Sequence, residues 1–341
     1  MDHAQPRPTS GLSRRRLLVG AAAGAAALAA STSPPAAGAP PAAPVDSLGA
    51  VRQIAAGDLD VGYVDMGPRD GRPVILLHGW PYDINSYAGV AAILTARGYR
   101  VIVPHLRGFG TTRFRSPSTM RNGQQAALAH DVVDLMDALR IPTAILGGYD
   151  WGGRTANVVA ALWPRRCAGL VAVSGYIIVD RDANLMPLRP QAEYGWWYQY
   201  YFATARGELG YRQNTAEFNE LIWRNASPLW HFDDATYLRS AAAFDNPDHV
   251  DVVIHNYRWR LSLADGEARY DADERRLADK PVITVPTITI ASDFDGPAKD
   301  GTPYRGRYVG PYHHRVLDGI GHNVPQEAPH EFASAIVDVT T

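Results

Sequence analysis

Short runs of apolar residues alternate with helical patterns along most of the chain from residue 51 onward. Four runs are nearly continuous in aliphatic residues, which is typical of parallel strands covered on both faces, and they span 73–79, 100–105, 143–149 and 168–175. Helices are predicted between these runs, over about 84–96, 122–140 and 152–163. In the second helix, leucine and valine recur at helical spacing, so one stripe faces the sheet. The alternation predicts an α/β fold with a mostly parallel, doubly wound sheet.

The strand pattern is interrupted in the second half of the chain. Residues 180–280 are rich in aromatic and charged side chains, and their periodicity is helical without strand-like runs. Strands return at 285–292 and 314–321, and a terminal helix is predicted over about 325–339. We therefore predict a helical cap inserted into a sheet domain, with the boundaries 46–178 for the first part of the core, 179–280 for the cap and 281–341 for the second part of the core.

The first 45 residues are predicted to lie outside the fold. Arg14 to Arg16 precede an Ala/Gly-rich apolar run from Val19 to Ala30, and a Pro/Ala/Ser-rich tract follows up to Pro44. This arrangement resembles a twin-arginine export signal, an address that the export machinery reads and that is then removed. A retained anchor is the alternative, but the apolar run is shorter than the roughly 20 residues that a membrane-spanning helix needs. We expect a periplasmic or secreted protein without stable membrane insertion.

Composition narrows the class of partner. The chain has 341 residues, 46% of them hydrophobic and 20% charged, so it can bury a large core, and its formal net charge is -2. A nucleic-acid partner would need a basic face, so a small-molecule substrate and water are the expected partners. No cofactor and no metal ion are expected. Cys167, the single cysteine, begins an apolar run and is predicted to be a small core residue, with a reactive thiol as the alternative.

The segment GGYDWGG, residues 147–153, joins a predicted strand to a predicted helix. Gly148, Gly152 and Gly153 permit a tight, strained turn there, which projects the side chain of Asp150 into a cavity. In a doubly wound fold the chemistry lies at such strand ends, because these loops meet at the carboxyl edge of the sheet. Asp150 is therefore the candidate nucleophile, and an ordinary helix N-cap is the alternative.

Two further strand ends supply the candidate base and acid. His322 follows the last predicted strand and precedes a helix with a proline in its first turn, so its imidazole can reach the turn at Asp150 as a general base. An acid that orients the histidine should follow the strand at 285–292, where Asp293 and Asp295 both qualify.

The segment LLHGWP, residues 76–81, ends another predicted strand. An oxyanion hole is predicted from the backbone N–H groups of Trp80 and Trp151. We expect the two indoles, together with His78 and Gly79, to contribute to the pocket for the leaving group. A plain turn at this position is the alternative.

The motifs HGWP, RGFGTT (107–112), GYDWGGR and GHNVPQEAP together resemble the α/β-hydrolases of the epoxide hydrolase and haloalkane dehalogenase group, over nearly the whole chain from residue 50. The resemblance implies an α/β-hydrolase fold and a triad in the order nucleophile, acid, histidine. The spacing in this group favours Asp295 as the acid, with Asp293 as a solvated or capping residue.

An aspartate nucleophile restricts the chemistry of the substrate. Attack of a carboxylate on an ester would form a high-energy anhydride, whereas attack on saturated carbon forms an ordinary ester. Water activated by His322 can then hydrolyse that ester, with the oxyanion hole stabilising the developing charge. The leaving group is therefore an epoxide oxygen, which needs a proton donor, or a halide, which needs only hydrogen-bond donors.

Cap tyrosines favour the epoxide. Epoxide hydrolases similar to this chain supply two tyrosines, one in a Tyr-Gln-x-Tyr-Phe context and one before an arginine, and Tyr198 and Tyr257 fit these contexts. Tyr200 and Tyr201 are the fallback donors, and packing inside the cap is the alternative role. The resemblance thus implies an enzyme, an epoxide hydrolase that forms a vicinal diol through a covalent ester on Asp150.

A hydrolytic dehalogenase is the second function that the resemblance implies. Haloalkane dehalogenases use the tryptophan after the nucleophile plus one more side-chain donor, so Trp151 fits and Trp80 could substitute for the second donor. Fluoroacetate dehalogenases usually have an arginine where this chain has Trp151, although Arg154 matches a second arginine of theirs. A small-molecule binding protein of the same fold is a third alternative, against which the complete triad argues. His105 replaces an acid that is usual in the group, which puts the hydrogen bonding around Arg107 in doubt.

Overall fold

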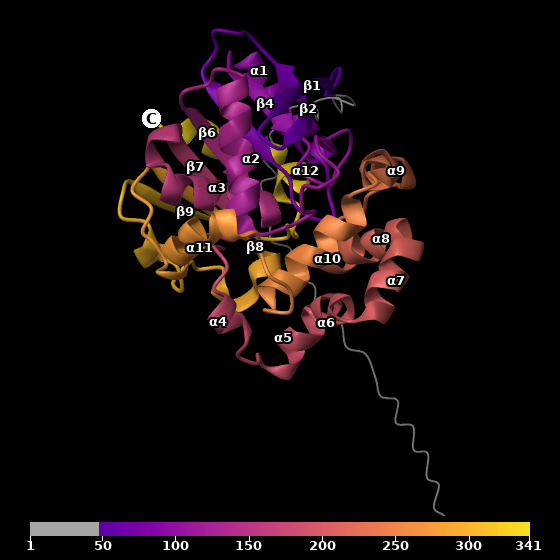
Figure 1. Cartoon of the computed structure of the whole chain (residues 1–341). Helices are drawn as coiled ribbons and strands as arrows, with labels where there is room; N and C mark the ends of the chain where they lie inside the picture. The colour runs from indigo at the N-terminus through magenta and orange to yellow at the C-terminus, as the bar shows by residue number, and fades with distance from the viewer. Residues whose placement is uncertain (1–47) are drawn as a thin grey trace, which may run out of the picture. The chain divides into compact units, whose positions relative to one another are not determined.

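The structure, a computed structural model, describes residues 48–341, in which nine strands form one sheet (Figure 1). The strands are β1 (Arg52–Ala56), β2 (Leu59–Met66), β3 (Pro73–Leu77), β4 (Arg100–Pro104), β5 (Arg113–Phe114), β6 (Ala144–Gly148), β7 (Cys167–Val173), β8 (Thr287–Ser292) and β9 (Tyr312–Leu317). Their order is β1-β2-β4-β3-β6-β7-β8-β9, and β5 pairs with β2. The six neighbouring strands β4, β3, β6, β7, β8 and β9 are parallel to one another. The strand β2 is antiparallel to β1, β4 and β5. This topology confirms the predicted α/β fold class.

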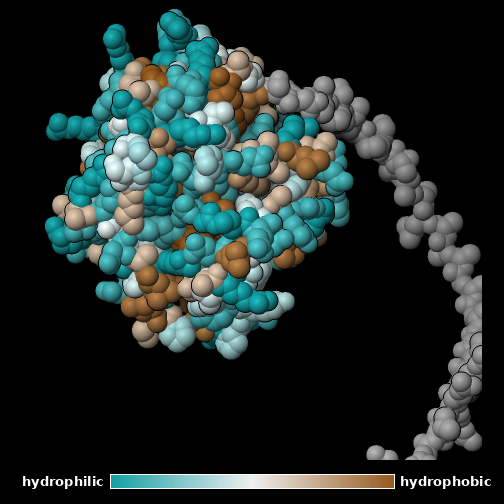
Figure 2. Space-filling model, turned by 45° about the vertical axis from the view of Figure 1, so that its right-hand side comes forward, coloured by the Kyte–Doolittle hydropathy of each residue, from teal (hydrophilic) through white to brown (hydrophobic). Residues whose placement is uncertain are grey.

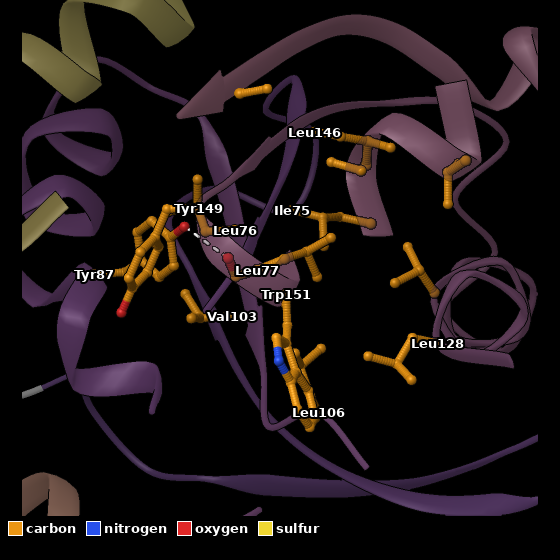
Figure 3. Close-up of a cluster of buried hydrophobic side chains, with 14 of the residues drawn as sticks. Ile75, Leu76, Leu77, Tyr87, Val103, Leu106, Leu128, Leu146, Tyr149 and Trp151 are labelled. Carbon is orange, nitrogen blue, oxygen red and sulfur yellow. Dashed lines mark hydrogen bonds between the residues drawn. The ribbon is translucent and has the colours of Figure 1, made fainter. Parts of the chain in front are cut away.

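Helices cover the sheet and bury its central strands. The helices α1 (Ala88–Ala96) and α13 (Pro329–Asp338) pack together, and α2 (Gln125–Ala138) packs on α3 (Asp150–Leu162). Figure 3 shows the buried cluster around β3, where Tyr149 lies beside Tyr87 and Trp151 points away from both. The two neighbours of Asp150 are therefore anchored in different parts of the core. Both of them are fully buried.

The prediction of one continuous terminal helix over 325–339 is wrong. The chain forms α12 (Val324–Glu327) and then α13, with Ala328 in a non-helical conformation between them. Pro329 follows Ala328, and a proline disfavours the helical conformation of the residue before it. The strand β5 was not predicted because two residues carry no periodic pattern, and only their pairing with β2 makes them a strand.

Between β7 and β8 the described chain contains only helices, in the stretch predicted to form an inserted cap. These elements are the α-helices α4 (Arg181–Asn184), α5 (Pro190–Gly195), α6 (Trp197–Ala203), α7 (Ala205–Gln213), α8 (Thr215–Ala226), α9 (Asp234–Ala241), α10 (His249–Arg260) and α11 (Asp271–Ala278), with two short 3-10 helices among them. Figure 1 shows α5 to α10 gathered at one side of the sheet. We call α4 to α11 the cap.

Cys167 lies at the start of β7 and is buried, which confirms its predicted place in the core. Burial raises the pKa of its thiol to about 12, so the reactive thiolate is disfavoured.

The predicted export signal lies outside the described residues. Within residues 48–341, no helix has the length and apolar character that crossing a membrane requires. Figure 2 shows a face that is mostly hydrophilic, with apolar side chains in scattered groups.

Candidate active site

Asp150 is the first residue of α3 and directly follows β6 and Tyr149. Its φ angle is 50°, in the left-handed region where a non-glycine residue costs about 1–3 kcal/mol. The turn is also too tight for larger neighbours, because a Cβ atom on Gly148 would lie 2.4 Å from the backbone carbon of Gly152. A strained aspartate at a strand-to-helix turn is the local structure that the sequence predicts for the nucleophile.

The carboxylate of Asp150 is held between a backbone donor and an imidazole. The backbone N–H of Trp80 donates to Oδ1 at 2.8 Å, and Nε2 of His322 lies 3.6 Å from Oδ2. Gly79 makes this approach possible, because a Cβ atom there would lie 2.5 Å from Cβ of Asp150. Burial raises the pKa of Asp150, but His322 and the positive charge of Arg154 outweigh burial, so the pKa lies below its ordinary value. Asp150 is therefore ionised at neutral pH, as a nucleophile must be.

His322 lies in the loop between β9 and α12, and two polar side chains hold its backbone. The hydroxyl of Ser227 accepts from the N–H of His322 at 2.9 Å and donates to Glu327 at 2.6 Å. Glu327 also accepts from the backbone N–H of Gly321 at 2.7 Å. The ring packs against Phe294 at a centroid distance of 4.1 Å. Nothing in the sequence pattern singled out Ser227, which the cap brings to the core.

The structure does not join Asp295 to His322 by a hydrogen bond. Oδ2 of Asp295 accepts from the backbone N–H of Ser292 at 2.9 Å, which closes a capping box at the start of the short 3-10 helix η5 (Asp293–Ala298). Nδ1 of His322 is buried and has no hydrogen-bond partner among the described residues. Asp293 accepts from Gly319 N–H at 2.8 Å and binds Lys299, as a capping or solvated residue would. The role of Asp295 in the triad stays a prediction.

Trp80 divides its two N–H groups between the core and the cap. Its backbone N–H holds Asp150, as expected of one oxyanion donor, whereas its indole Nε1–H donates to the hydroxyl of Tyr211 at 2.9 Å. Tyr211 comes from α7 and is fully buried. The indole N–H of Trp80 is thus already bonded, which argues against its predicted role as a halide donor. The indole N–H of Trp151 is buried and has no partner among the described residues.

His78 braces the loop instead of contributing to the pocket. Its Nδ1 donates to the carbonyl of Gly79 at 2.9 Å, and its Nε2 accepts from the N–H of Leu106 at 3.1 Å. Burial lowers the pKa of His78 to about 4, so the ring is neutral and both nitrogens are occupied. The prediction of His78 as a pocket residue is therefore corrected, because a histidine with both nitrogens bonded to backbone offers nothing to a ligand.

Tyr198 on α6 and Tyr257 on α10 meet on the ring of Trp80. Their ring centroids lie 5.2 and 5.1 Å from that of Trp80 and 5.4 Å from each other. Neither hydroxyl is held by a hydrogen bond of normal geometry, although weak polar contacts join the Tyr257 hydroxyl to Tyr198 and to the indole of Trp151. Burial, together with the nearby charge of Asp150, raises the pKa of both tyrosines above its ordinary value. Both hydroxyls therefore keep their protons at neutral pH.

The fallback tyrosines lie elsewhere. Tyr200 is 48% exposed and donates to Glu193. The ring of Tyr201 stacks on Phe218 at 5.9 Å. The helical phase of α6 thus directs Tyr198, and not Tyr200, toward the site.

Comparisons with known proteins agree with this fold. A sequence profile of the alpha/beta hydrolase fold matches residues 72–227. A Klebsiella pneumoniae protein that carries a provisional assignment as an epoxide hydrolase has a solved structure that is 58% identical, with a TM-score of 0.85, over 87% of this chain and 99% of that one. The chain belongs to the α/β-hydrolase fold family.

Curated relatives of this α/β-hydrolase include an epoxide hydrolase and a haloalkane dehalogenase, the two kinds of enzyme that its motifs resemble. It is 32% identical to epoxide hydrolase B of Mycobacterium tuberculosis over 152 residues, which cover 41% of this chain and 42% of that protein. It is 37% identical to a haloalkane dehalogenase of Psychrobacter cryohalolentis over 115 residues, 34% of this chain and 37% of that protein. The chain thus spans less than half the length of the first curated relatives it matches.

The α/β-hydrolase has a cavity of about 450 Å³ beside Asp150, a size that suits a small organic molecule. Trp80, Tyr198 and His322 line it together with Asp150. The other lining residues come from η5 and from the cap, and they are Gln191, Ala192, Tyr194, Gly195, Trp196, Trp197, Ile222, Asn225, Ala226 and Phe294. Most of the wall is therefore supplied by the cap, whose contacts with the core no local sequence pattern specifies.

The departure at His105 is compensated within this α/β-hydrolase. Arg107 is fully buried and pairs with Asp131 at 2.6 Å, and it also donates to the side chain of Asn122 at 3.1 Å. His105 takes no part in this ion pair, and burial lowers its pKa to about 3, so the ring is neutral. Asp131 on α2 thus supplies the acid that the sequence lacked next to Arg107.

Proposed function

We propose that this protein hydrolyses an epoxide to a vicinal diol through a covalent ester on Asp150. The observation that carries the proposal is the pair of protonated cap tyrosines packed together on Trp80, of which Tyr198 lines the cavity that contains Asp150 and Tyr257 packs against Tyr198. An opening epoxide develops alkoxide charge, and a positioned hydroxyl with a retained proton is the donor that such a charge needs. The similarity to epoxide hydrolase B and to the Klebsiella pneumoniae protein supports the same reaction.

In the first step, Oδ2 of Asp150 attacks one carbon of the epoxide and the carbon–oxygen bond of the ring breaks. Oδ1 stays on the backbone N–H of Trp80, which leaves Oδ2 as the attacking atom. The released alkoxide takes a proton from Tyr198 or Tyr257, and the second tyrosine donates a hydrogen bond. The product of this step is an ester between Asp150 and a β-hydroxyalkyl group.

In the second step, water attacks the carbonyl carbon of the ester while Nε2 of His322 takes the proton of the water. Negative charge then develops on Oδ1, where the Trp80 N–H already points. The bond between this carbon and Oδ2 breaks, so Oδ2 leaves as an oxygen of the diol and takes the second proton of the attacking water, while the water oxygen stays in the carboxylate of Asp150. Proton transfer from the imidazolium to the tyrosinate restores the resting site. Nδ1 of His322 needs a stabilising acceptor during this step, and we assign that role to Asp295 as a proposal.

A dehalogenase is the second candidate, favoured by the indole N–H of Trp151, which forms no hydrogen bond of normal geometry, and by the similarity to a haloalkane dehalogenase. One halide donor is available in Trp151, but the indole of Trp80 is already bonded to Tyr211. Halide release also makes no use of the two tyrosine hydroxyls. We therefore favour epoxide hydrolysis over dehalogenation.

The covalent step is tested by a single turnover in heavy-oxygen water with enzyme in excess over styrene oxide. Hydrolysis at the ester carbonyl transfers one solvent oxygen into the carboxylate of Asp150, so mass analysis should find the label in the peptide that contains Asp150. Label found only in the diol would mean direct attack of water on the epoxide and would overturn the proposal.

The leaving group is tested with Tyr198→Phe, Tyr257→Phe and the double variant, assayed on styrene oxide, a bromoalkane and fluoroacetate. Loss of a general acid costs about 10²–10⁴-fold, so the double variant should lose at least about a hundredfold in epoxide turnover. Tyr200→Phe is the matched control on the same helix, because Tyr200 is exposed and faces away from the site. Unchanged epoxide turnover in the double variant, or faster turnover of a halide than of any epoxide by the parent protein, would refute the assignment.

A further inference from the structure

The imidazole ring of His322 is not fixed by hydrogen bonds of its own. Nδ1 is buried and has no hydrogen-bond partner among residues 48–341, and Nε2 lies 3.6 Å from Oδ2 of Asp150, slightly beyond the length of a hydrogen bond. The ring is surrounded by aromatic side chains, with centroid distances of 4.1 Å to Phe294 and 5.8 Å to Tyr149. A catalytic group must be held within about 0.5 Å of its productive position. The position of this ring therefore depends on how firmly its backbone is held.

The backbone of His322 is attached to the end of α8, which is a helix of the cap. Its N–H is shared between the hydroxyl of Ser227 at 2.9 Å and the carbonyl of Ala226 at 3.2 Å. Ser227 caps the C-terminus of α8 and is 1% exposed, so water does not compete for this hydrogen bond. Ser227 and His322 are 95 positions apart in the chain. The cap, and not the core alone, thus determines where the base lies.

Glu327 joins the Ser227 hydroxyl and the loop of His322 on one carboxylate. Its Oε1 accepts from the Ser227 hydroxyl at 2.6 Å and from the N–H of Asn323 at 3.0 Å. Its Oε2 accepts from the N–H of Gly321 at 2.7 Å. The carboxylate therefore binds the residues on both sides of His322 and, through Ser227, the cap. Hydrogen bonds to a carboxylate are roughly twice as strong as those between neutral groups.

Gly321 allows the loop of His322 to lie directly against Ser227. A Cβ atom on Gly321 would lie 2.5 Å from both Cα and Oγ of Ser227, so a larger residue would separate the loop from α8. The same end of α8 also faces the cavity that contains Asp150, which is lined by Ile222, Asn225 and Ala226. One segment of the cap thus forms part of the cavity wall and holds the loop of the base.

We propose that Ser227 is a positioning residue for His322, through which the cap sets the rate of ester hydrolysis. This inference rests on the proposed covalent route, in which His322 takes a proton from water only in the second step, whereas Asp150 attacks the epoxide without it. A displacement of about 1 Å in a reacting group lowers a rate by about a hundredfold. Loss of the Ser227 contact should therefore slow hydrolysis of the ester on Asp150 and leave formation of the ester close to the parent rate.

The two steps are followed separately in a single turnover of styrene oxide with enzyme in excess, quenched with acid and analysed by the mass of the intact protein. We expect Ser227→Ala to form the ester at the rate of the parent and to hydrolyse it at least about tenfold more slowly. Gly321→Ala should have the same effect, because it displaces the same loop without removing a polar group.

Ser240→Ala is the matched control. Ser240 is also a buried cap serine whose hydroxyl donates to a core carboxylate at 2.6 Å, but neither Ser240 nor its acceptor Asp83 lines the cavity. Its ester hydrolysis should match that of the parent. Parent-like hydrolysis in both Ser227→Ala and Gly321→Ala would overturn the proposal. Equal slowing of both steps in these two variants, or the same slow hydrolysis in Ser240→Ala, would also overturn it, because either result indicates a general loss of stability.

Nuclear magnetic resonance of the imidazole groups separates this inference from the proposed reaction, because it needs no turnover. The signal of His322 is the one that disappears in His322→Gln. We expect it to shift or broaden in Ser227→Ala and to stay unchanged in Ser240→Ala.

The variant His322→Gln also tests the covalent route, since it should accumulate the ester. If it forms no ester, the proposed reaction fails, and a shifted His322 signal in Ser227→Ala keeps Ser227 as the residue that positions the imidazole. If His322→Gln accumulates the ester but Ser227→Ala has an unchanged His322 signal and parent-like hydrolysis, the positioning role alone fails. Far-ultraviolet circular dichroism identifies a variant that does not fold, and the other of Ser227→Ala and Gly321→Ala then decides.

Discussion

Tyr211→Phe removes a hydroxyl on which three buried groups converge, from Trp80, Asn219 and His249 at 2.9, 3.0 and 2.9 Å. The hydroxyl accepts from the Trp80 indole N–H. His249 Nδ1 donates to the carbonyl of Gly108, so its Nε2 is an acceptor, as is the side-chain oxygen of Asn219. The single proton of the hydroxyl goes to one of these two acceptors. Phenylalanine therefore leaves one buried donor and at least one buried acceptor unpaired.

Each buried group left without a partner costs about 1–3 kcal/mol. The two groups together should lower the free energy of unfolding by about 2–6 kcal/mol. With a urea m-value of about 3 kcal/mol/M, the midpoint of urea unfolding should fall by about 0.7–2 M. The measurement is urea denaturation of both proteins, followed by tryptophan fluorescence and by circular dichroism.

Tyr237→Phe is the control for this prediction. Tyr237 is also a buried cap tyrosine, but its hydroxyl makes one hydrogen bond, to the carbonyl of Ala216. The Tyr237→Phe variant should lose only about 1 kcal/mol of unfolding free energy. If the two variants lose the same free energy of unfolding, the three hydrogen bonds at Tyr211 do not stabilise the protein as much as we infer.

Three other perturbations give distinct outcomes. Gly79→Ala places a Cβ atom 2.5 Å from that of Asp150. This variant should lower kcat by at least about a hundredfold, because a displacement of about 1 Å in a reacting group has an effect of that size. Full activity of the variant would contradict the close approach of Gly79 to Asp150. Burial raises the pKa of Asp83 to about 6, so Asp83 adds stability below pH 4 that is lost as the pH rises through 6. The stability of the parent relative to Asp83→Asn should therefore fall by about 2–3 kcal/mol between pH 4 and 7 in urea unfolding, and a constant difference would refute the shift. Replacing Arg14 and Arg15 by lysine should retain the precursor in the cytoplasm on immunoblots of cell fractions, and normal export would exclude a twin-arginine signal.

The sheet and the turn at Asp150 could be predicted because both depend on local pattern. Continuous apolar runs mark strands buried on both faces, and glycines on both sides of Asp150 permit its left-handed turn. His322 could be placed because it follows the last strand directly. Tyr198 could be distinguished from Tyr200 only through the resemblance, since the helical phase of a short aromatic segment is ambiguous from sequence alone.

Other roles depended on contacts between distant parts of the chain. Asp295 follows the expected strand, but the backbone N–H of Ser292 already occupies one of its oxygens. The indole of Trp80 bonds to Tyr211, which lies 131 residues away in the sequence.

The sequence by itself determined the alternation of the long strands with helices, the strained aspartate and the histidine that follows the last strand. These features follow from side-chain periodicity and from the backbone freedom of glycine, which act over a few residues. Only the tertiary structure decided which donor each polar group would find, because the cap and the core meet through pairs far apart in the chain. The hydrogen bond from the Trp80 indole to Tyr211 is the clearest example, since it joins residues 131 positions apart in the chain.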